Sequence, residues 1–322
     1  MLNVKKIWEE LKLNSNSEEY FNLNTHYLNG INFHFLWRVP ENNLSFGIDL
    51  KYDLNIDDQF KNLSSLSLEK LKISASEEIV VINLLDTDLE DPFQEFIQTI
   101  VDNVATIENS EDAQEIFLEK ISNFQKLFEK GRFGKLKKTE IRGLYAELCF
   151  LEHLIDNTSP KALENWQGPH NGLHDFVMEN YAVEVKSYMS QQSVRILNER
   201  QLDPHSSNKL FLAAFHIQED PSGISINEKI EILEKKFTGK LRLQFISTLN
   251  DSGYFKTHAI YYEKFLLKEN VRSLYQINTN FPSTKVLNLN PEIFNIKYQL
   301  DLTKCDNWLI DFDKHLELYE KN

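Results

Sequence analysis

The apolar and polar positions near the middle of the chain alternate in a way that predicts a β-hairpin. Residues 173–178 and 181–188 both have strand character, and in the second stretch valines alternate with polar residues. Glu179 and Asn180 lie between them and suit a two-residue turn, because Asn tolerates the positive φ that such turns need. The length of this turn fixes which residues of the two strands are partners.

The predicted register brings three charged side chains together. Asp175 falls directly opposite Glu184, and Lys186 lies two residues further along the same face because the side-chain repeat of a strand is two. Two carboxylates about 5 Å apart repel each other by roughly 3 kcal/mol at an effective dielectric constant of about 20. A Mg²⁺ ion between them would reverse that sign, and a water molecule held near Lys186 would then be the nucleophile.

A plainer interpretation of the same hairpin also stands. Glu184 and Lys186 are compatible with the solvated face of a half-buried strand, and for an isolated E-x-K on a strand this is the commoner case. A slip of one residue in the turn would also separate Asp175 from Glu184.

A third carboxylate precedes the hairpin on a predicted helix. Residues 138–155 have the periodicity of an amphipathic helix, and Glu147 falls inside the apolar stripe of that helix. A carboxylate in such a position needs a charged partner, a metal ion or water. The alternative is that Glu147 lies at the edge of the stripe and turns outward toward Arg142 or Lys138.

Other patterns predict further elements along the chain. Residues 1–13 form a short amphipathic helix, and residues 91–130 have the repeated apolar faces of helices. A third helix is predicted over 227–237. Strands are predicted over seven other apolar stretches, at 32–39, 44–50, 78–85, 193–197, 209–217, 241–246 and 255–262.

Composition restricts the class of protein. With 322 residues, of which 41% are hydrophobic, the chain is long enough to bury a sizeable core. No apolar run is long enough for a membrane span, and the first residues do not have the pattern of a signal peptide. Cys149 and Cys305 are the only cysteines, so disulfides are not expected and a reducing cytoplasm fits.

The net charge argues against a uniformly nucleic-acid-binding surface. Asp and Glu number 49 against 35 Lys and Arg, which gives a formal charge of −14. The distribution of charge matters more than the sum. One basic cluster leads into the Glu147 helix and could hold phosphates near a metal ion; it consists of Lys130, Arg132, Lys135, Lys137, Lys138 and Arg142. A solvated linker between helices accounts for this cluster equally well.

Taken in order, the motifs between residues 142 and 203 resemble those of the bacterial PD-(D/E)XK motif protein family. Five short runs carry the resemblance: R-G-L-Y-A-E-L at 142–148, W-Q-G-P at 166–169, H-D-F at 174–176, A-V-E-V-K at 182–186 and Q-L-D at 201–203. The chain departs from the family pattern at two places. His174 stands where the superfamily name has Pro, and Ala146 stands where Gly is expected before the helix acid.

The resemblance implies a fold and a domain organisation. The fold is α/β with a mixed sheet of the α+β kind. A restriction-endonuclease-like core with a C-terminal extension occupies residues 135–322. A β-rich N-terminal region over 1–90 and a helical connector over 91–134 precede this core.

The resemblance also implies roles for particular residues. Asp175 and Glu184 are expected to be metal ligands, and Lys186 is expected to position the attacking water and to stabilise charge. Glu147 is expected to be an accessory acid that also reaches the metal. Gln201 follows the E-x-K strand and is expected to assist at the site.

The implied activity is Mg²⁺-dependent endonucleolytic cleavage of DNA, with Mn²⁺ as a substitute, in restriction or phage defence. The implied partners are DNA and an ATPase or methyltransferase subunit of a defence system, and a homodimer is compatible with the family. The alternative, which the overall acidity keeps open, is a non-catalytic DNA- or protein-binding subunit on the same fold. RNA cleavage is a third, weaker option. The presence of Asp175, Glu184 and Lys186 together favours the nuclease.

Overall fold

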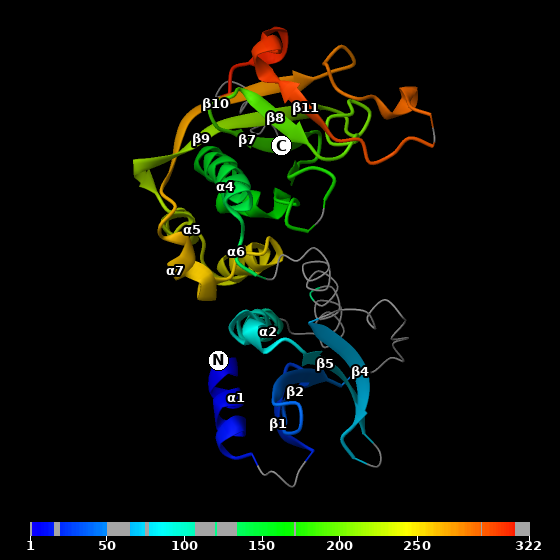
Figure 1. Ribbon diagram of the computed structural model, residues 1–322, viewed down its shortest axis with the longest axis vertical. Coiled ribbons are helices and arrows are strands. Elements are labelled where there is room, and N and C mark those ends of the chain that lie inside the picture. Colours follow the sequence, from blue (N-terminus) through cyan, green and yellow to red (C-terminus); the bar gives the residue numbers. More distant parts are fainter. Residues whose placement is uncertain are drawn as a thin grey trace. The chain divides into compact units, whose positions relative to one another are not determined.

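The chain divides into two compact units by its contacts. The computed structural model describes residues 2–15, 20–49, 65–74, 77–106, 120, 134–170, 172–290 and 292–312 (Figure 1). The first unit comprises Met1–Lys135 and Leu249–His258, and the second comprises Leu136–Thr248 and Ala259–Asn322. The helical connector predicted over 91–134 stays a prediction, because residues 107–119 and 121–133 lie outside the described part of the chain.

In its described residues, the first unit is an antiparallel sheet with two helices packed against it. The strand order is β1-β2-β3-β5-β4. The bounds are Phe21–Leu28 for β1, Ile31–Arg38 for β2, Asn43–Ile48 for β3, Leu66–Lys72 for β4, Glu78–Leu84 for β5, Val4–Leu13 for α1 and Glu90–Val104 for α2. Trp8 of α1 lies between Phe35 of β2 and Phe93 of α2, with ring centroids 5.3 and 5.7 Å away, so aromatic contacts join the helices to the sheet.

The sequence predicts the inner strands of this sheet better than its edges. The strands expected over 32–39, 44–50 and 78–85 are β2, β3 and β5, and the helix expected over 1–13 is α1. The apolar pattern does not predict β1 and β4. Both are edge strands that leave most of their side chains partly exposed, so polar residues obscure the alternation.

The second unit is built on a mixed sheet in the order β12-β10-β9-β7-β6, with a separate antiparallel pair formed by β8 and β11. β7 and β9 are parallel, and the other neighbours are antiparallel. The strand bounds are Phe176–Val177 for β6, Ala182–Tyr188 for β7, Ser193–Ile196 for β8, Leu210–Ile224 for β9, Leu267–Ile277 for β10, Tyr298–Asp301 for β11 and Leu309–Ile310 for β12. This mixed α/β architecture confirms the predicted fold class.

Among the described residues, four α-helices have all or most of their residues in the second unit. Their bounds are Lys138–Asn157 for α4, Ile226–Glu234 for α5, Gly239–Asp251 for α6 and Ala259–Tyr262 for α7. The helix α4 packs along β7 and is the helix predicted over 138–155. Among the helices described, none is long and apolar enough to cross a membrane.

One face of the mixed sheet packs against the β8–β11 pair. Ala182 and Tyr188 of β7 and Leu212 of β9 share an apolar core with Ile196 of β8 and Leu300 of β11. Because side chains alternate along a strand, every second residue of β7 points to this same face. Glu184 and Lys186 are two of those residues.

The strand predicted over 241–246 is wrong, because these residues lie in α6. Leu241, Phe245 and Leu249 are spaced by four residues, so they satisfy a helical stripe as well as a strand alternation. In the structure Phe245 and Leu249 are buried, which is the outcome expected for the helical stripe.

The strand predicted over 255–262 is also wrong. The segment forms a 3-10 turn, Lys256–His258, followed by α7. The carboxylate of Glu95 on α2 accepts the backbone N–H groups of Lys256 and Thr257 at 2.7 and 2.9 Å. This contact stabilises the start of a helical turn from a residue far away in the sequence, so no local pattern predicts it.

Candidate active site

The β6–β7 hairpin has the register that the sequence predicts. Phe176 pairs with Val183, and continuing the register by one residue brings Asp175 opposite Glu184. β6 begins at Phe176, so Asp175 occupies the position directly before this strand. The slip that would have separated the two carboxylates does not occur.

The turn of this hairpin differs in one detail from the prediction. Met178 donates its backbone N–H to the carbonyl of Tyr181 at 2.9 Å, which closes the two-residue connection as expected. Neither Glu179 nor Asn180 has a positive φ, however. The connection therefore does not use the left-handed backbone for which Asn was expected to be suited.

Asp175 is fixed through both its backbone and its side chain. Its carbonyl accepts the N–H groups of Gln167 and Gly168 at 2.8 and 3.0 Å. Its Oδ2 accepts the N–H of Val185 at 2.7 Å, across the hairpin. The carboxylate is therefore held against β7 beside Glu184, and Oδ1 remains for other contacts.

Glu184 and Lys186 form an ion pair inside the protein. The Lys186 ammonium donates to Oε1 of Glu184, and the exposed fractions of these side chains are 16% and 0%. The other oxygen, Oε2 of Glu184, is buried and has no hydrogen-bond partner in the structure. A solvated strand face does not fit these observations, so the plainer interpretation of the E-x-K is wrong.

Glu147 of α4 turns toward the hairpin. Its Oε2 accepts a hydrogen bond of 2.8 Å from the indole N–H of Trp166. Lys138, toward which Glu147 was alternatively expected to turn, instead donates to Glu219 at 2.9 Å. Glu147 is thus one of the site acids and does not turn outward to the basic side chain.

Gly168 opens the space that two of the carboxylates share. A Cβ atom added to this glycine would lie 2.8 Å from Oδ1 of Asp175 and 3.1 Å from Oε2 of Glu147. The first distance is shorter than real Cβ contacts and the second is tighter than most, so a side chain at this position would displace at least the Asp175 carboxylate. The two carboxylates therefore face one small space between α4, the hairpin and residues 166–168.

Burial raises the pKa values of all three acids, and repulsion from Asp175 adds to the shift for Glu184 and Glu147. Burial raises the pKa of Glu184 to about 8, with a further contribution from Asp175 that the Lys186 ammonium offsets in part. The pKa of Glu147 is raised well above its usual range by burial and then by Asp175. Burial also raises the pKa of Asp175, which the Lys186 ammonium and the Val185 N–H oppose. The single ammonium of Lys186 therefore does not balance the three carboxylates when all of them are ionised.

Lys186 remains protonated at neutral pH. Burial alone would lower the pKa of its ammonium, but the carboxylates of Glu184 and Asp175 outweigh burial and raise this pKa to about 12. Lys186 is consequently a source of positive charge and a hydrogen-bond donor, and not a base, while both acids are ionised.

The donor set fits a divalent cation. Asp175, Glu184 and Glu147 supply only carboxylate oxygens, which Mg²⁺ and Mn²⁺ prefer, and Oε2 of Glu184 lacks any partner. Within the described residues, no three His, Cys, Asp or Glu side chains are already arranged around one metal position. In this arrangement Lys186 supplies the positive charge, and the three acids are the residues that would hold the cation.

No described contact joins the remaining predicted site residues to the three acids. The side-chain oxygen of Gln201 accepts the N–H of Leu197 at 3.0 Å and so stabilises the loop after β8. Lys137 is exposed at the first turn of α4, and Lys135 belongs to the first unit. Lys130 and Arg132 lie outside the described residues.

Two members of the basic cluster contact the far part of β9. Lys138 pairs with Glu219 and lies over the ring of Phe265, 5.0 Å from its centroid. Arg142 is half-buried, lines a small pocket with these residues, and has a pKa lowered by burial. Glu219 lies seven residues beyond Leu212, the partner of Glu184 on β9. The described contacts of Lys138 and Arg142 are with Glu219 and Phe265 and not with the carboxylates.

Sequence reasoning did not assign a role to several residues around the acids. Trp166 holds Glu147, and Gly168 leaves space for the carboxylates. His174 is buried beside Asp175, its Nε2 lies 3.0 Å from Oγ of Ser206, and burial together with Lys186 lowers its pKa to about 4. The W-Q-G-P and H-D-F runs contain all three residues, so the order of the motifs was the available signal.

An acid from a helix, an acid that begins a hairpin and an E-x-K on the next strand, all on a mixed sheet, define a protein of the PD-(D/E)XK class. The chain belongs to the family described as "Putative PD-(D/E)XK family member, (DUF4420)", whose family model matches residues 4–303. That match covers nearly the whole chain and confirms the resemblance. No curated protein and no solved structure gives a significant match.

Proposed function

We propose that this protein is a metal-dependent phosphodiesterase that cleaves DNA internally. The observation that carries the proposal is the buried, charge-deficient cluster in which Glu184 keeps one oxygen without a partner. Isolated buried carboxylates are strongly unfavourable, so a site that retains three of them beside one ammonium is suited to binding a cation. Membership of the PD-(D/E)XK class supports phosphodiester hydrolysis as the reaction.

Each residue has a role in this proposal. Asp175, Glu184 and Glu147 hold the cation, which supplies Lewis-acid activation of the phosphate and of water when it is bound. Lys186 orients the attacking water and offsets the negative charge that develops on the phosphate. Trp166 holds Glu147 in place, and the Val185 N–H holds Asp175. Mg²⁺ is the proposed cation, with Mn²⁺ as a substitute.

The setting of the activity rests on the family resemblance. We propose a role in restriction or phage defence in the cytoplasm, with an ATPase or methyltransferase subunit as a partner and a homodimer as an assembly. These parts of the proposal are separable from the chemistry, because the carboxylate cluster is complete within one chain.

The experiment is a cleavage assay on supercoiled plasmid DNA with purified full-length protein in Mg²⁺, Mn²⁺ or EDTA. Single-stranded DNA and RNA of matched length are the other substrate arms. We expect nicked and linear products in either cation and none in EDTA, and Lys186→Ala should abolish them. Glu231→Gln, at an exposed acid on α5, is the matched control and should cleave like the wild type.

Two outcomes would replace the proposal. Cleavage that survives Lys186→Ala would show that the products come from another site or a contaminant. Failure of the wild type to cut any substrate, alone or with the products of neighbouring genes, would leave the non-catalytic binding subunit as the better account of the fold. Cleavage of RNA alone would change the substrate class and leave the residue roles in place.

A further inference from the structure

A segment near the C-terminal end of the second unit is hydrogen-bonded to the loop that follows β8. We call the described residues 285–290 and 292–297 the strap. Asp203 Oδ2 accepts the N–H of Val286 at 3.1 Å, and Glu199 Oε2 accepts the N–H of Ile296 at 3.0 Å. Both carboxylates are buried, with exposed fractions of 5% and 9%. One carboxylate therefore binds the backbone near each end of the strap.

The base of the strap adjoins the face of the sheet that carries Glu184 and Lys186. Tyr298 follows the strap directly, pairs with Ile196 of β8 and packs against the apolar core that includes Ala182. Its phenol oxygen accepts the N–H of Thr284, the residue before the strap, at 3.5 Å. Tyr298 therefore joins both ends of the strap to this face of the sheet.

The strap presents apolar side chains to solvent. The exposed fractions are 75% for Leu287, 50% for Ile293 and 72% for Phe294. Figure 1 shows the strap in orange and red beside β11, away from α5, α6 and α7. The backbone of the strap is hydrogen-bonded near both ends, while the phenyl ring of Phe294 stays exposed to solvent. Such a surface is suited to a partner that covers the ring.

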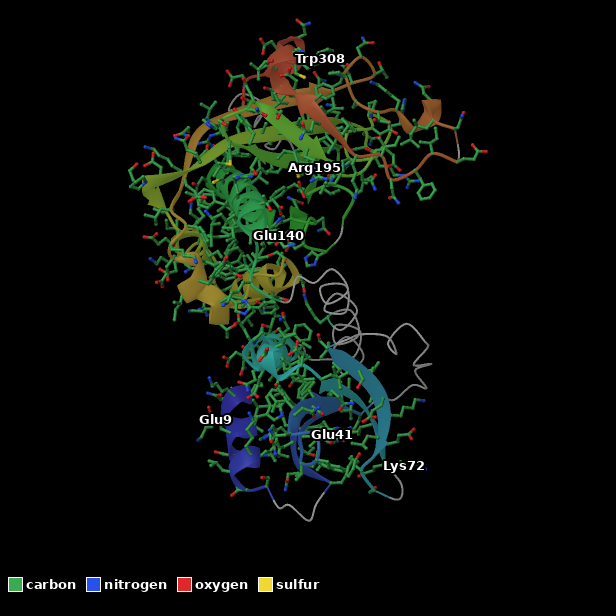
Figure 2. The ribbon with its side chains drawn as sticks, viewed as in Figure 1. Glu9, Glu41, Lys72, Glu140, Arg195 and Trp308 are labelled. Atoms are coloured by element: carbon green, nitrogen blue, oxygen red, sulfur yellow. The ribbon has the colours of Figure 1, made fainter. Side chains whose placement is uncertain are left out.

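The charged side chains around the strap are mainly basic. In residues 193–209 the exposed charges are Arg195, Arg200 and Lys209, because both acids of this segment, Glu199 and Asp203, are turned inward. Lys297 adds a fourth exposed cation, and Glu292 is the one acid of the strap. In the part of the chain that the structure describes, none of these four cations forms an ion pair. Figure 2 shows Arg195 in the region of β8.

We infer that the strap and the loop after β8 bind single-stranded DNA, with Phe294 stacked on an unpaired base and Arg195, Arg200 and Lys297 on phosphates. Exposed aromatic rings flanked by cations are the recurrent means of holding single strands without sequence preference. In a chain of formal charge −14, a group of exposed cations that form no ion pair within the described residues is complementary to a polyanion. This inference rests on the proposed function, and it names the strand that the site receives.

The test is binding of fluorescein-labelled oligothymidylate to full-length protein in EDTA, measured by fluorescence anisotropy at several salt concentrations. The wild type should bind the single strand more tightly than a duplex hairpin of equal length. Phe294→Ala should weaken binding by about tenfold or more, because an aromatic stack on one base is lost. The fluorescence of a strand that contains 2-aminopurine should be quenched when the wild type binds it and should not be quenched by this variant.

The contribution of the cations is tested separately, by the salt dependence of binding. Replacing Arg195, Arg200 and Lys297 together by Ala should reduce the slope of log affinity against log salt by about two, because three phosphate contacts are lost on a single strand. Ile260→Ala, at a side chain 83% exposed on α7, and Lys240→Ala, at an exposed cation on α6, are the matched controls and should bind like the wild type.

The outcomes separate this inference from the proposed function. If the protein cleaves DNA but Phe294→Ala binds single strands as well as Ile260→Ala does, the strap does not bind the strand. If binding depends on Phe294 but no cation supports cleavage, the nuclease proposal fails and the strap assignment stands. If light scattering instead shows a dimer that only Phe294→Ala dissociates, the strap is a protein interface and the inference is wrong.

Discussion

The indole N–H of Trp166 donates a hydrogen bond of 2.8 Å to Oε2 of Glu147, so a buried tryptophan determines where the helix acid points. The same indole ring lies parallel to the ring of Phe176, with centroids 6.4 Å apart. Phe176 begins β6 directly after Asp175. One side chain thus links the helix acid to the strand that positions the second acid.

Trp166→Phe should separate the two functions of this side chain. The phenyl ring can retain much of the packing against Phe176, but Glu147 loses its only described hydrogen-bond donor. We expect a loss of roughly 1 to 3 kcal/mol in the free energy of unfolding, as for other buried groups left without a partner. Urea unfolding measures this loss, and weaker Mn²⁺ binding by calorimetry should accompany it. Unchanged Mn²⁺ affinity would show that Glu147 is not a ligand.

Gly168→Ala should close the space between two carboxylates. The added methyl group would lie 2.8 Å from Oδ1 of Asp175 and 3.1 Å from Oε2 of Glu147, so at least one carboxylate must move. We expect the thermal stabilisation by Mn²⁺ and the cleavage activity to be lost together. Gly143→Ala is the matched control, because a Cβ atom there has nothing within 4 Å. That variant should gain up to about 1 kcal/mol of helix stability and keep its metal response.

Asp175→Asn should remove most of the stabilisation that Mg²⁺ or Mn²⁺ gives to the folded protein. A ligand that binds only the folded state raises the unfolding temperature by mass action, and the carboxylate of Asp175 is one of the three proposed oxygen donors. Differential scanning calorimetry with and without cation measures the shift. Glu231→Gln, an exposed acid on α5, should respond like the wild type. Equal shifts in Asp175→Asn and wild type would remove Asp175 from the ligand set.

Lys186→Ala should abolish cleavage and retain cation binding, because the three carboxylates stay in place. Without cation and above pH 8, where Glu184 is ionised in the wild type, the variant leaves this buried acid without its charged partner, which should lower the free energy of unfolding by up to about 3 to 5 kcal/mol. Urea titration in EDTA and in Mn²⁺ should show that the cation restores part of this loss. Lys138→Ala removes an exposed ion pair with Glu219 and should cost less than about 1 kcal/mol.

The metal-free protein should lose stability as pH rises from 6.5 to 8. Glu184 has a pKa of about 8 in the folded protein against an ordinary value of 4.5, so the folded state keeps a proton that the unfolded state releases. Stability from this proton is complete below pH 4.5 and is lost as pH rises through 8, with a slope of up to about 1.4 kcal/mol per pH unit.

His174 contributes with the opposite sign below pH 6.5, so the range from 6.5 to 8 isolates the contribution of Glu184. Its pKa is lowered to about 4 from 6.5, so its contribution is lost as pH falls below 6.5. Urea unfolding of wild type and Glu184→Gln in EDTA at several pH values checks the prediction between 6.5 and 8. A parallel pH dependence in the two proteins would contradict the assignment to Glu184.

The sequence predicts the hairpin and the helix acid because both depend on short-range geometry. A strand repeat of two and a turn of fixed length place Asp175 opposite Glu184, and a helical repeat places Glu147 on the apolar face of α4. These relationships extend over only a few residues. The structure therefore preserves them even though the expected positive φ in the turn is absent.

Longer-range contacts explain what the sequence did not predict. Lys138 pairs with Glu219, which lies 81 residues away, so the density of basic residues along the chain did not reveal that this cation is already paired. Leu241 and Phe245 fit either a strand or a helix, and only packing chooses the helix. Glu95 on α2 stabilises the turn at Lys256 through another contact between residues that are far apart in the sequence.

The two carboxylates that fasten the strap bind backbone N–H groups and not side chains. Glu199 and Asp203 would therefore accept almost any sequence between Val286 and Ile296, provided that the backbone still reaches both. The strap can then be exchanged without altering Asp175 or Glu184. A chain carrying a different strap should keep its cation and its chemistry while gaining a new preference for the strand it holds, so substrate choice and hydrolysis can diverge independently.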